Sequence, residues 1–156
     1  MAESPFRHKK ADDSAGFLVF KLTALWQQRL GAVFGELGIT QTQYAILASL
    51  RWFETQGEPP TQSHLVAHAR IEKMTLSKAI RQLEEMGLLK RDASPHDSRA
   101  VHVRFTAAGR KLVQRAVVAV EDADDDFFGR LSASDLTHYK ALTARVVGAN
   151  TSIATS

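Results

Sequence analysis

The sequence contains no cysteine, which excludes disulfide bonds, thiolate metal ligands and a cysteine-based peroxide switch. It also has no run of eighteen or more apolar residues, the length that a membrane-spanning helix requires. The first sixteen residues are polar and carry no apolar block of the signal-peptide type. We therefore expect a cytoplasmic protein with no membrane partner, and any sensing must use a chemistry other than thiol oxidation.

Catalytic motifs are missing as well. The sequence has no glycine-rich phosphate loop, no Gly-x-Ser-x-Gly, and no histidine placed with serine or aspartate at a known catalytic spacing. We expect neither an enzyme nor a bound cofactor. His64 and His68 are four residues apart, which suits two metal ligands, but Glu72 is only a loosely placed third ligand. Two ordinary helix histidines, and no metal site, are the favoured interpretation.

The positive charge of the chain is concentrated in its middle. The formal net charge is +3, but residues 70–115 hold eleven basic against five acidic side chains (net +6). Residues 116–156 hold three basic against six acidic side chains (net −3). A local cationic excess is typical of a surface that binds the phosphates of nucleic acid. On charge alone, the alternative is a solvated basic surface with no partner.

Hydrophobic periodicity predicts a mainly helical chain. From Ser14 to about Phe34, large apolar residues recur at helical spacing and cover more than one face, so one face can meet the core and another a second chain. Capping signals predict where the other helices begin. These helices follow Thr40, Thr61, Ile71, Thr106 and Ser132, and they end near Gly57, His68, Met86, Phe128 and Val147.

Two of these helices have the spacing of a helix-turn-helix, because only Ala69-Arg70-Ile71 separates them. The second helix, Glu72 to Met86, carries its apolar residues on one side and a polar, partly cationic set on the other. The apolar set is Leu76, Ala79, Ile80 and Leu83, and the outer set is Met74, Ser77, Lys78 and Arg81. The inner set is predicted to anchor the helix, and the outer set is available to read DNA.

A short hairpin follows this helix, with strands at Leu88–Arg91 and Val101–Phe105 and the tip Ser94-Pro95-His96-Asp97-Ser98-Arg99. A helix followed by such a hairpin is the order that a winged helix on DNA requires, with the helix in the major groove and the hairpin tip at the minor groove. A guanidinium is favoured in a narrow minor groove, so Arg99 is the predicted contact there, with Asp97 holding it or fixing the turn. Arg91 and Arg104 flank the tip, where phosphate contact and ordinary exposed charge are equally good interpretations.

Three motifs carry a resemblance to a known family. They are Met74-Thr75-Leu76-Ser77-Lys78-Ala79-Ile80-Arg81-Gln82-Leu83-Glu84-Glu85-Met86-Gly87-Leu88-Leu89, the wing pattern Asp97-Ser98-Arg99-Ala100, and Phe105-Thr106-Ala107-Ala108-Gly109. The chain resembles the MarR family of bacterial winged helix-turn-helix transcription regulators over roughly residues 14–147. Two departures are Phe105, where the family usually has leucine, and the absence of an acid before Pro95.

The resemblance implies a ligand-responsive homodimeric repressor whose first helix and last two helices interlock with those of a second chain. It also implies a pseudo-palindromic double-stranded DNA operator and a small aromatic or phenolic acid as effector, to which we assign no residues. The fold class is then mainly α with a small β-hairpin: a winged helix-turn-helix with N- and C-terminal dimerisation helices.

The expected domain organisation is a single domain over residues 14–147, between a flexible arm (1–13) and a flexible tail (148–156). Within it, the winged helix-turn-helix spans about residues 40–106, and the dimerisation helices span about 14–35 and 107–147.

The candidate DNA-binding residues lie on the outer face of the second helix and on the hairpin: Met74, Thr75, Ser77, Lys78, Arg81, Arg91, Asp97, Ser98 and Arg99. The competing interpretation is an adaptor that uses the winged fold to bind a protein, since fold alone does not determine function. The cationic hairpin argues against an adaptor. Salt distinguishes the two, because DNA binding weakens steeply as salt rises and an apolar protein contact does not.

Overall fold

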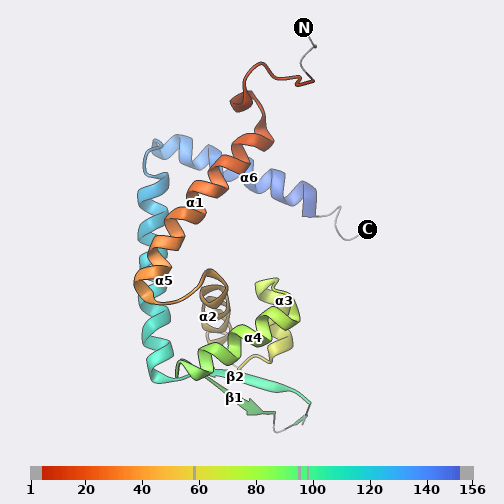
Figure 1. The fold of residues 1–156 in the computed structure, drawn as a ribbon, viewed down its shortest axis with the longest axis vertical. Coiled ribbons are helices and arrows are strands. Elements are labelled where there is room, and N and C mark those ends of the chain that lie inside the picture. Colours follow the sequence, from red (N-terminus) through yellow and green to blue (C-terminus); the bar gives the residue numbers. More distant parts are fainter. Residues whose placement is uncertain (1–4, 58, 95, 98, 152–156) are drawn as a thin grey trace. The chain divides into compact units, whose positions relative to one another are not determined.

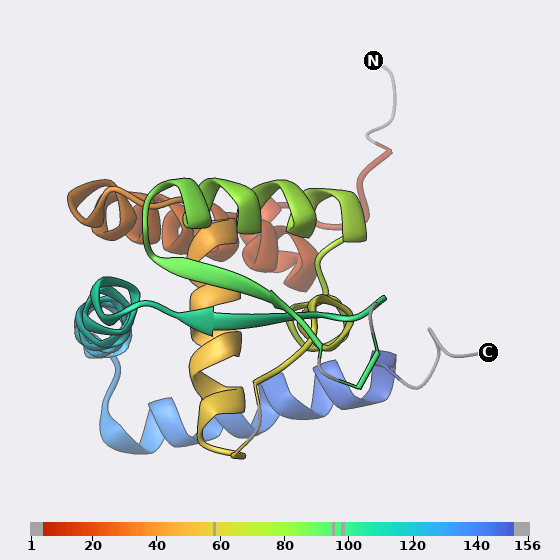
Figure 2. The same cartoon turned by 90° about the horizontal axis from the view of Figure 1, so that it is seen from below.

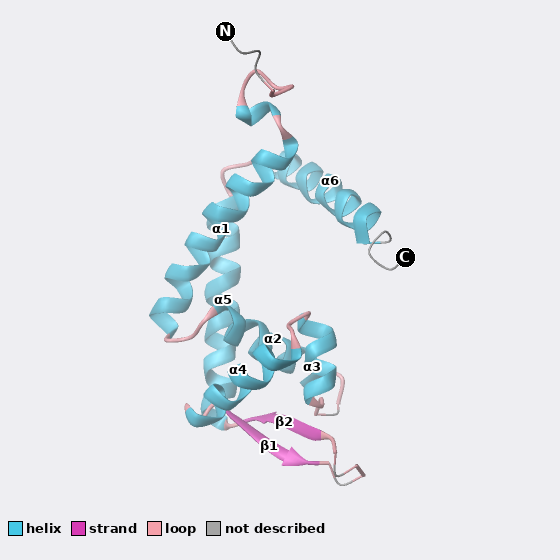
Figure 3. Cartoon of the chain, turned by 45° about the vertical axis from the view of Figure 1, so that its right-hand side comes forward, coloured by secondary structure: helices cyan, strands magenta, loops and turns pink. Residues whose placement is uncertain are grey.

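The computed structural model describes residues 5–57, 59–94, 96–97 and 99–151, and it is mainly helical with one hairpin (Figures 1 and 3). The elements in chain order are η1 (Ala11–Asp13), α1 (Ala15–Leu37), α2 (Gln41–Glu54), α3 (Gln62–Ala69), α4 (Lys73–Glu85), β1 (Leu89–Ala93), β2 (Val101–Phe105), α5 (Ala107–Phe128) and α6 (Ala133–Thr151). The chain divides between Val120 and Glu121 into two compact units. The helices and the single hairpin confirm the predicted fold class, mainly α with a small β-hairpin. No helix in the described part is long and apolar enough to cross a membrane.

Side-chain caps set the starts of several helices, as the sequence predicts. The Thr40 hydroxyl accepts a hydrogen bond from the backbone N–H of Gln43 at 3.1 Å, and the Gln43 side chain accepts one from the backbone N–H of Thr40 at 2.9 Å. Thr61 caps α3 in the same way, through the backbone N–H of His64 at 3.2 Å. These bonds satisfy N–H groups that a helix cannot pair by itself, so each helix begins at a defined residue.

The first unit is built around the helix-turn-helix. The turn between α3 and α4 passes through Arg70, whose φ of 53° places it in the left-handed region. The apolar side chains of α2, α3 and α4 meet in a common core, which the hairpin and the first half of α5 complete. The fully buried large residues of this core are Ile46, Leu47, Leu50, Leu65, Leu76, Ile80, Leu83, Leu89, Val103 and Val113.

The hairpin is attached to this core at its base and along one edge. β1 and β2 pair antiparallel from Leu89 with Phe105 at the base to Ala93 with Val101 near the tip. The backbone N–H of Val103 donates to the carbonyl of Pro60 at 3.0 Å, which ties β2 to the segment that leads into α3. In Figure 2 the hairpin is seen with α4 running along one side of it. The wing is thus held against both helices of the helix-turn-helix.

Thr106 and Gly109 join the base of the hairpin to α5. The Thr106 hydroxyl donates to the carbonyl of Gly87 at 2.6 Å and lies 3.1 Å from that of Leu88. It also accepts from the backbone N–H of Gly109 at 3.0 Å. Gly109 packs so closely on Leu88 that a Cβ at this position would overlap the Leu88 carbonyl oxygen. The start of α5 therefore requires glycine here.

The second unit contains the end of α5 and all of α6. Phe128 packs on Tyr139 with ring centroids 5.4 Å apart, and Ser132 caps α6 by accepting from the backbone N–H of Asp135 at 3.1 Å.

Two element boundaries differ from the sequence-based prediction. α6 continues four residues past the predicted end at Val147, and in this last turn the Asn150 side-chain amide and the Thr151 hydroxyl donate to the carbonyls of Val146 and Val147, both at 2.8 Å. Residues 148–151, predicted as tail, are thus helical. The predicted arm contains η1, whose last residue, Asp13, bonds to the backbone N–H of Lys10 at 3.3 Å.

Candidate DNA-binding surface

Glu72 fixes the first turn of α4. Its carboxylate accepts from the backbone N–H groups of Met74 and Thr75, both at 2.9 Å, and the Thr75 hydroxyl lies 3.2 Å away. The bonds from Met74 and Thr75 hold the pKa of the Glu72 carboxyl below its ordinary value. Thr75 is one of the candidate DNA contacts, and its hydroxyl donates to the Glu72 carboxylate. Glu72 is therefore the N-cap of α4.

We predict that Glu72→Ala lowers stability near neutral pH and that this deficit shrinks in acid. The pKa of Glu72 is lower in the folded protein than in the unfolded chain. Its stabilising contribution is therefore complete above the unfolded value of about 4.3 and is lost as the pH falls through the folded value. Urea unfolding of wild type and variant at pH 7 and pH 3 measures this, with Glu85→Ala as the matched control on the same helix. An equal deficit at both pH values would contradict the role as an ionised cap.

The two faces of α4 are divided as predicted. Leu76, Ala79, Ile80 and Leu83 are buried, whereas Met74 is 71% exposed and Lys78 and Arg81 are also exposed. Ser77 is half-buried and accepts a hydrogen bond from the Arg81 guanidinium at 3.3 Å. Lys78 makes no hydrogen bond or ion pair with any residue that the structure describes. The outer face therefore presents an unpaired ammonium and a guanidinium that needs further acceptors.

Arg91 differs from these residues because a carboxylate already holds its charge. Its Nη2 lies 2.7 Å from Glu84 Oε2, and its Nε donates to the same oxygen at 2.8 Å. The Arg91 guanidinium in turn lowers the pKa of the Glu84 carboxyl. Arg104 lies 3.5 Å from Asp92 on the neighbouring strand. Both hairpin arginines are thus partly neutralised, which weakens the phosphate-contact interpretation for each.

The tip of the wing is ordered by its own polar side chains. Asp97 Oδ1 accepts from the backbone N–H of Arg99 at 2.9 Å, and the Ser94 hydroxyl accepts from the backbone N–H groups of His96 and Asp97 at 3.3 and 3.4 Å. Asp97 therefore bonds the turn backbone, which is one of its two predicted roles. The Arg99 guanidinium has no partner among the described residues. Ser98, another candidate, lies outside the described residues.

The two histidines of α3 are taken up by packing. His68 stacks on Trp52 with ring centroids 4.7 Å apart, and its Nδ1 lies 3.0 Å from the Ser49 hydroxyl. His64 Nδ1 accepts from the backbone N–H of Thr61 at 3.4 Å. Across the residues the structure describes, no three His, Asp or Glu side chains form a group that could hold a metal.

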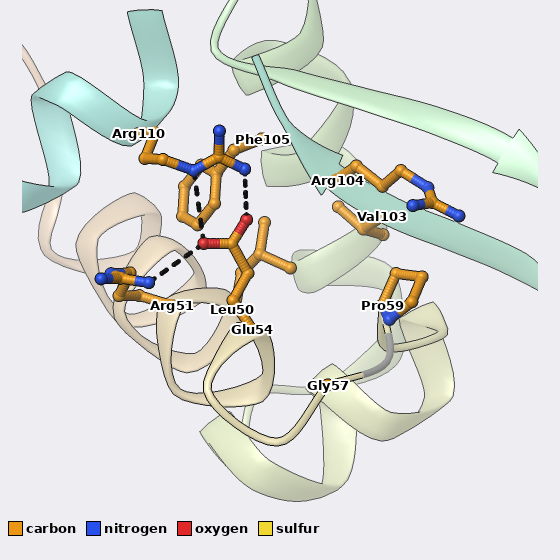
Figure 4. Close-up of a pocket in the computed structure, with 9 residues that line it drawn as sticks. All are labelled: Leu50, Arg51, Glu54, Gly57, Pro59, Val103, Arg104, Phe105 and Arg110. Atoms are coloured by element: carbon orange, nitrogen blue, oxygen red, sulfur yellow. Dashed lines mark hydrogen bonds and ion pairs between the residues drawn. The ribbon is translucent and has the colours of Figure 1, made fainter. Parts of the chain in front are cut away.

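Sequence analysis missed a charged cluster at the junction of α2 and α5 (Figure 4). The Glu54 carboxylate lies 2.6 Å from Arg110 and 3.2 Å from Arg51, beside a cavity of about 420 Å³. Glu54 raises the pKa of the Arg110 guanidinium. No local sequence pattern predicts this ion pair, because Glu54 and Arg110 are 56 residues apart in the sequence. Sequence analysis also did not identify Glu72 as a helix cap, although acidic residues are enriched where helices begin.

The winged-helix geometry agrees with comparisons to known proteins. Residues 35–124, more than half of the chain, match the family model described as ArnR1-like, winged-helix domain. A Bacillus subtilis protein named as the uncharacterized HTH-type transcriptional regulator YdcH is 33% identical over 74% of this chain and 78% of its own length. The HTH-type transcriptional repressor Rv2887 of Mycobacterium tuberculosis is 28% identical over 87% of this chain and 96% of its own length.

Solved structures show the same fold. An Escherichia coli MarR variant in complex with operator DNA matches with a TM-score of 0.73 and 22% identity, covering 84% of this chain and 91% of its own. A structure of Bordetella bronchiseptica BpsR, described as the mechanism for regulation of its DNA binding by 6-hydroxynicotinic acid, matches with a TM-score of 0.76 and 22% identity. That match covers 92% of this chain and 98% of BpsR. Proteins of this family are transcription regulators and not enzymes. The chain belongs to the ArnR1-like winged-helix family and is a DNA-binding transcription regulator, and its fold is that of the solved MarR structures.

Proposed function

We propose that the protein is a homodimeric repressor that binds a specific operator, with the outer face of α4 in the major groove and Arg99 of the wing in the adjacent minor groove. One observation carries this proposal. The outer face of α4 and the wing tip present cationic side chains, Lys78 and Arg99, with no partner among the described residues. Unpaired cations at both positions suit the negative potential of DNA. Met74, Ser77 and Arg81 supply the remaining side chains that face the bases.

The exposed apolar surface of α1 supports a dimer. Phe20 is 70% exposed, Val19 is 63% exposed and Leu25 is 54% exposed, and Phe17 and Leu18 are exposed beside them. Burying one large apolar side chain contributes about 1.5–3 kcal/mol, so a dimer in which a second copy covers this face would be stabilised substantially. In the other unit, α6 also exposes Leu142, Val146 and Val147. These helices include the segments that the family resemblance assigns to dimerisation.

A two-fold dimer would place two copies of α4 about 34–36 Å apart, the distance of one turn of DNA. The operator would then be a pseudo-palindrome, since each half-site is read by the same residues. Repression follows where the operator overlaps a promoter, because a dimer seated there excludes the polymerase.

We further propose that a small aromatic or phenolic acid regulates this binding. The regulation of BpsR by 6-hydroxynicotinic acid supports this class of effector. The acid would act by binding better to one spacing of the two recognition helices than to another, since a ligand shifts an equilibrium only through differential affinity.

Selection of bound sequences from random duplex DNA, repeated with a panel of small aromatic acids, tests the proposal. We expect an enriched pseudo-palindrome whose recovery falls with at least one acid. Sedimentation of the free protein at micromolar concentration should give a dimer. If the protein is a monomer and enriches no DNA sequence, the proposal is rejected. An adaptor would instead bind a protein partner, and that binding would not depend steeply on salt.

A further inference from the structure

A small pocket of about 290 Å³ lies between the wing and the helix-turn-helix. It is lined by Thr61, Gln62 and Ser63 at the start of α3, by Lys73 at the first position of α4, and by the segment 99–101 with Asp97 beside it. None of these lining residues except Asp97 and Arg99 was among the candidate contacts of the sequence. The pocket thus adds a separate element to the DNA-binding surface.

The groups around this pocket suit an anion. Lys73 is exposed and makes no hydrogen bond or ion pair with a described residue. Asp97, the acidic lining residue, already uses Oδ1 to accept from the backbone N–H of Arg99 at 2.9 Å. The Thr61 hydroxyl accepts from the backbone N–H of His64, so its own hydrogen is available for donation, as is that of Ser63. Lys73 and Arg99 carry two positive charges and Asp97 carries one negative charge, so the net charge of the pocket is positive.

The position of the pocket identifies the anion. One sugar–phosphate strand separates a major groove from the neighbouring minor groove. If α4 enters the first and the wing enters the second, that strand must cross the gap between them. Lys73 begins α4 and Arg99 belongs to the wing, so the pocket occupies this gap.

We propose that this pocket holds a backbone phosphate of DNA, with Lys73 supplying the cation and Thr61 and Ser63 supplying hydroxyl donors. The inference rests on the proposed DNA-binding mode. A phosphate contact fixes the register of the protein on the duplex and carries no sequence information. Lys73 is therefore a positioning contact, in contrast to the base-facing Lys78 five residues later.

Salt titration of Lys73→Ala, against both the selected operator and an unrelated duplex, tests the proposal. Because each of the two subunits of the proposed dimer loses one phosphate contact, the slope of log affinity against log salt should fall by about 1.8. Over a fourfold range of salt this is a difference of about twelvefold. Affinity for the operator and for the unrelated duplex should fall by the same factor. Lys111→Ala removes one exposed charge from α5 outside the pocket and should leave the wild-type slope unchanged. Lys73→Arg keeps the positive charge and should have the wild-type slope.

Neutral backbone substitutions locate the contact. Replacing operator phosphates one at a time by methylphosphonate should weaken wild-type binding at one position per half-site beside the minor groove, and Lys73→Ala should be insensitive there. An unchanged slope for Lys73→Ala, or a loss confined to the operator, would overturn the phosphate site while leaving DNA binding intact. Absence of salt-dependent binding by the wild type would instead reject the proposed function itself.

Discussion

Replacing Arg99 by alanine is expected to weaken operator binding more than any other single change on the DNA-binding surface. The Arg99 guanidinium has no partner among the described residues, so it needs no rearrangement before it enters the minor groove. A specific arginine contact contributes about 1–3 kcal/mol, which corresponds to about 5- to 160-fold in affinity for each wing. Because a dimer carries two wings, the measured loss should exceed that range. Fluorescence anisotropy with the selected operator measures it.

Arg115→Ala is the matched control for Arg99→Ala. It removes the same charge from an exposed position on α5, and it should leave operator affinity within about twofold, since distant surface charges are screened at physiological salt. Arg99→Lys should recover only part of the loss, because an ammonium is more strongly hydrated than a guanidinium. Unchanged affinity of Arg99→Ala would remove the wing from the proposed binding mode.

Gly109→Ala is expected to have the largest effect on stability. Its new methyl group would overlap the carbonyl oxygen of Leu88, which is backbone and cannot rotate away as a side chain can. Relief requires α5 to move off the base of the hairpin, which breaks the Thr106 bonds to Gly87 and Leu88. We expect a loss of at least about 3 kcal/mol in the free energy of unfolding, measured by urea denaturation.

Gly35→Ala is the comparison that separates this overlap from the general effect of alanine. Gly35 lies within α1, and a Cβ there would meet open space. Alanine is favoured over glycine inside a helix by about 0.5–1 kcal/mol, so this variant should be as stable as the wild type or slightly more stable. If both variants unfolded at the same urea concentration, the close approach of Gly109 to Leu88 would not exist in solution.

Sequence patterns predicted the fold well wherever the determining interaction is local. Thr40 with Gln43 is a capping box within four residues, and the two faces of α4 follow from helical periodicity. The same locality explains why the turn role of Asp97 could be anticipated, since it bonds the backbone N–H of Arg99 two residues away. For such features the chain near a residue contains everything that decides its conformation.

The remaining features depend on partners that are distant in sequence. The sequence left open whether Arg91 contacts a DNA phosphate or is an ordinary exposed charge. In the structure the Glu84 carboxylate binds the Arg91 guanidinium across the turn that joins α4 to β1. The pocket beside Lys73 exists only because the start of α3 is brought next to the wing.

The bridge from Glu54 to Arg110 has a mechanical meaning for a regulator of this kind. It clamps the last turn of α2 to the first turns of α5 through two carboxylate oxygens, at 2.6 and 3.5 Å from the guanidinium (Figure 4). A two-point attachment restrains rotation as well as separation, so we expect the first turns of α5 to move together with α2 and not independently of it.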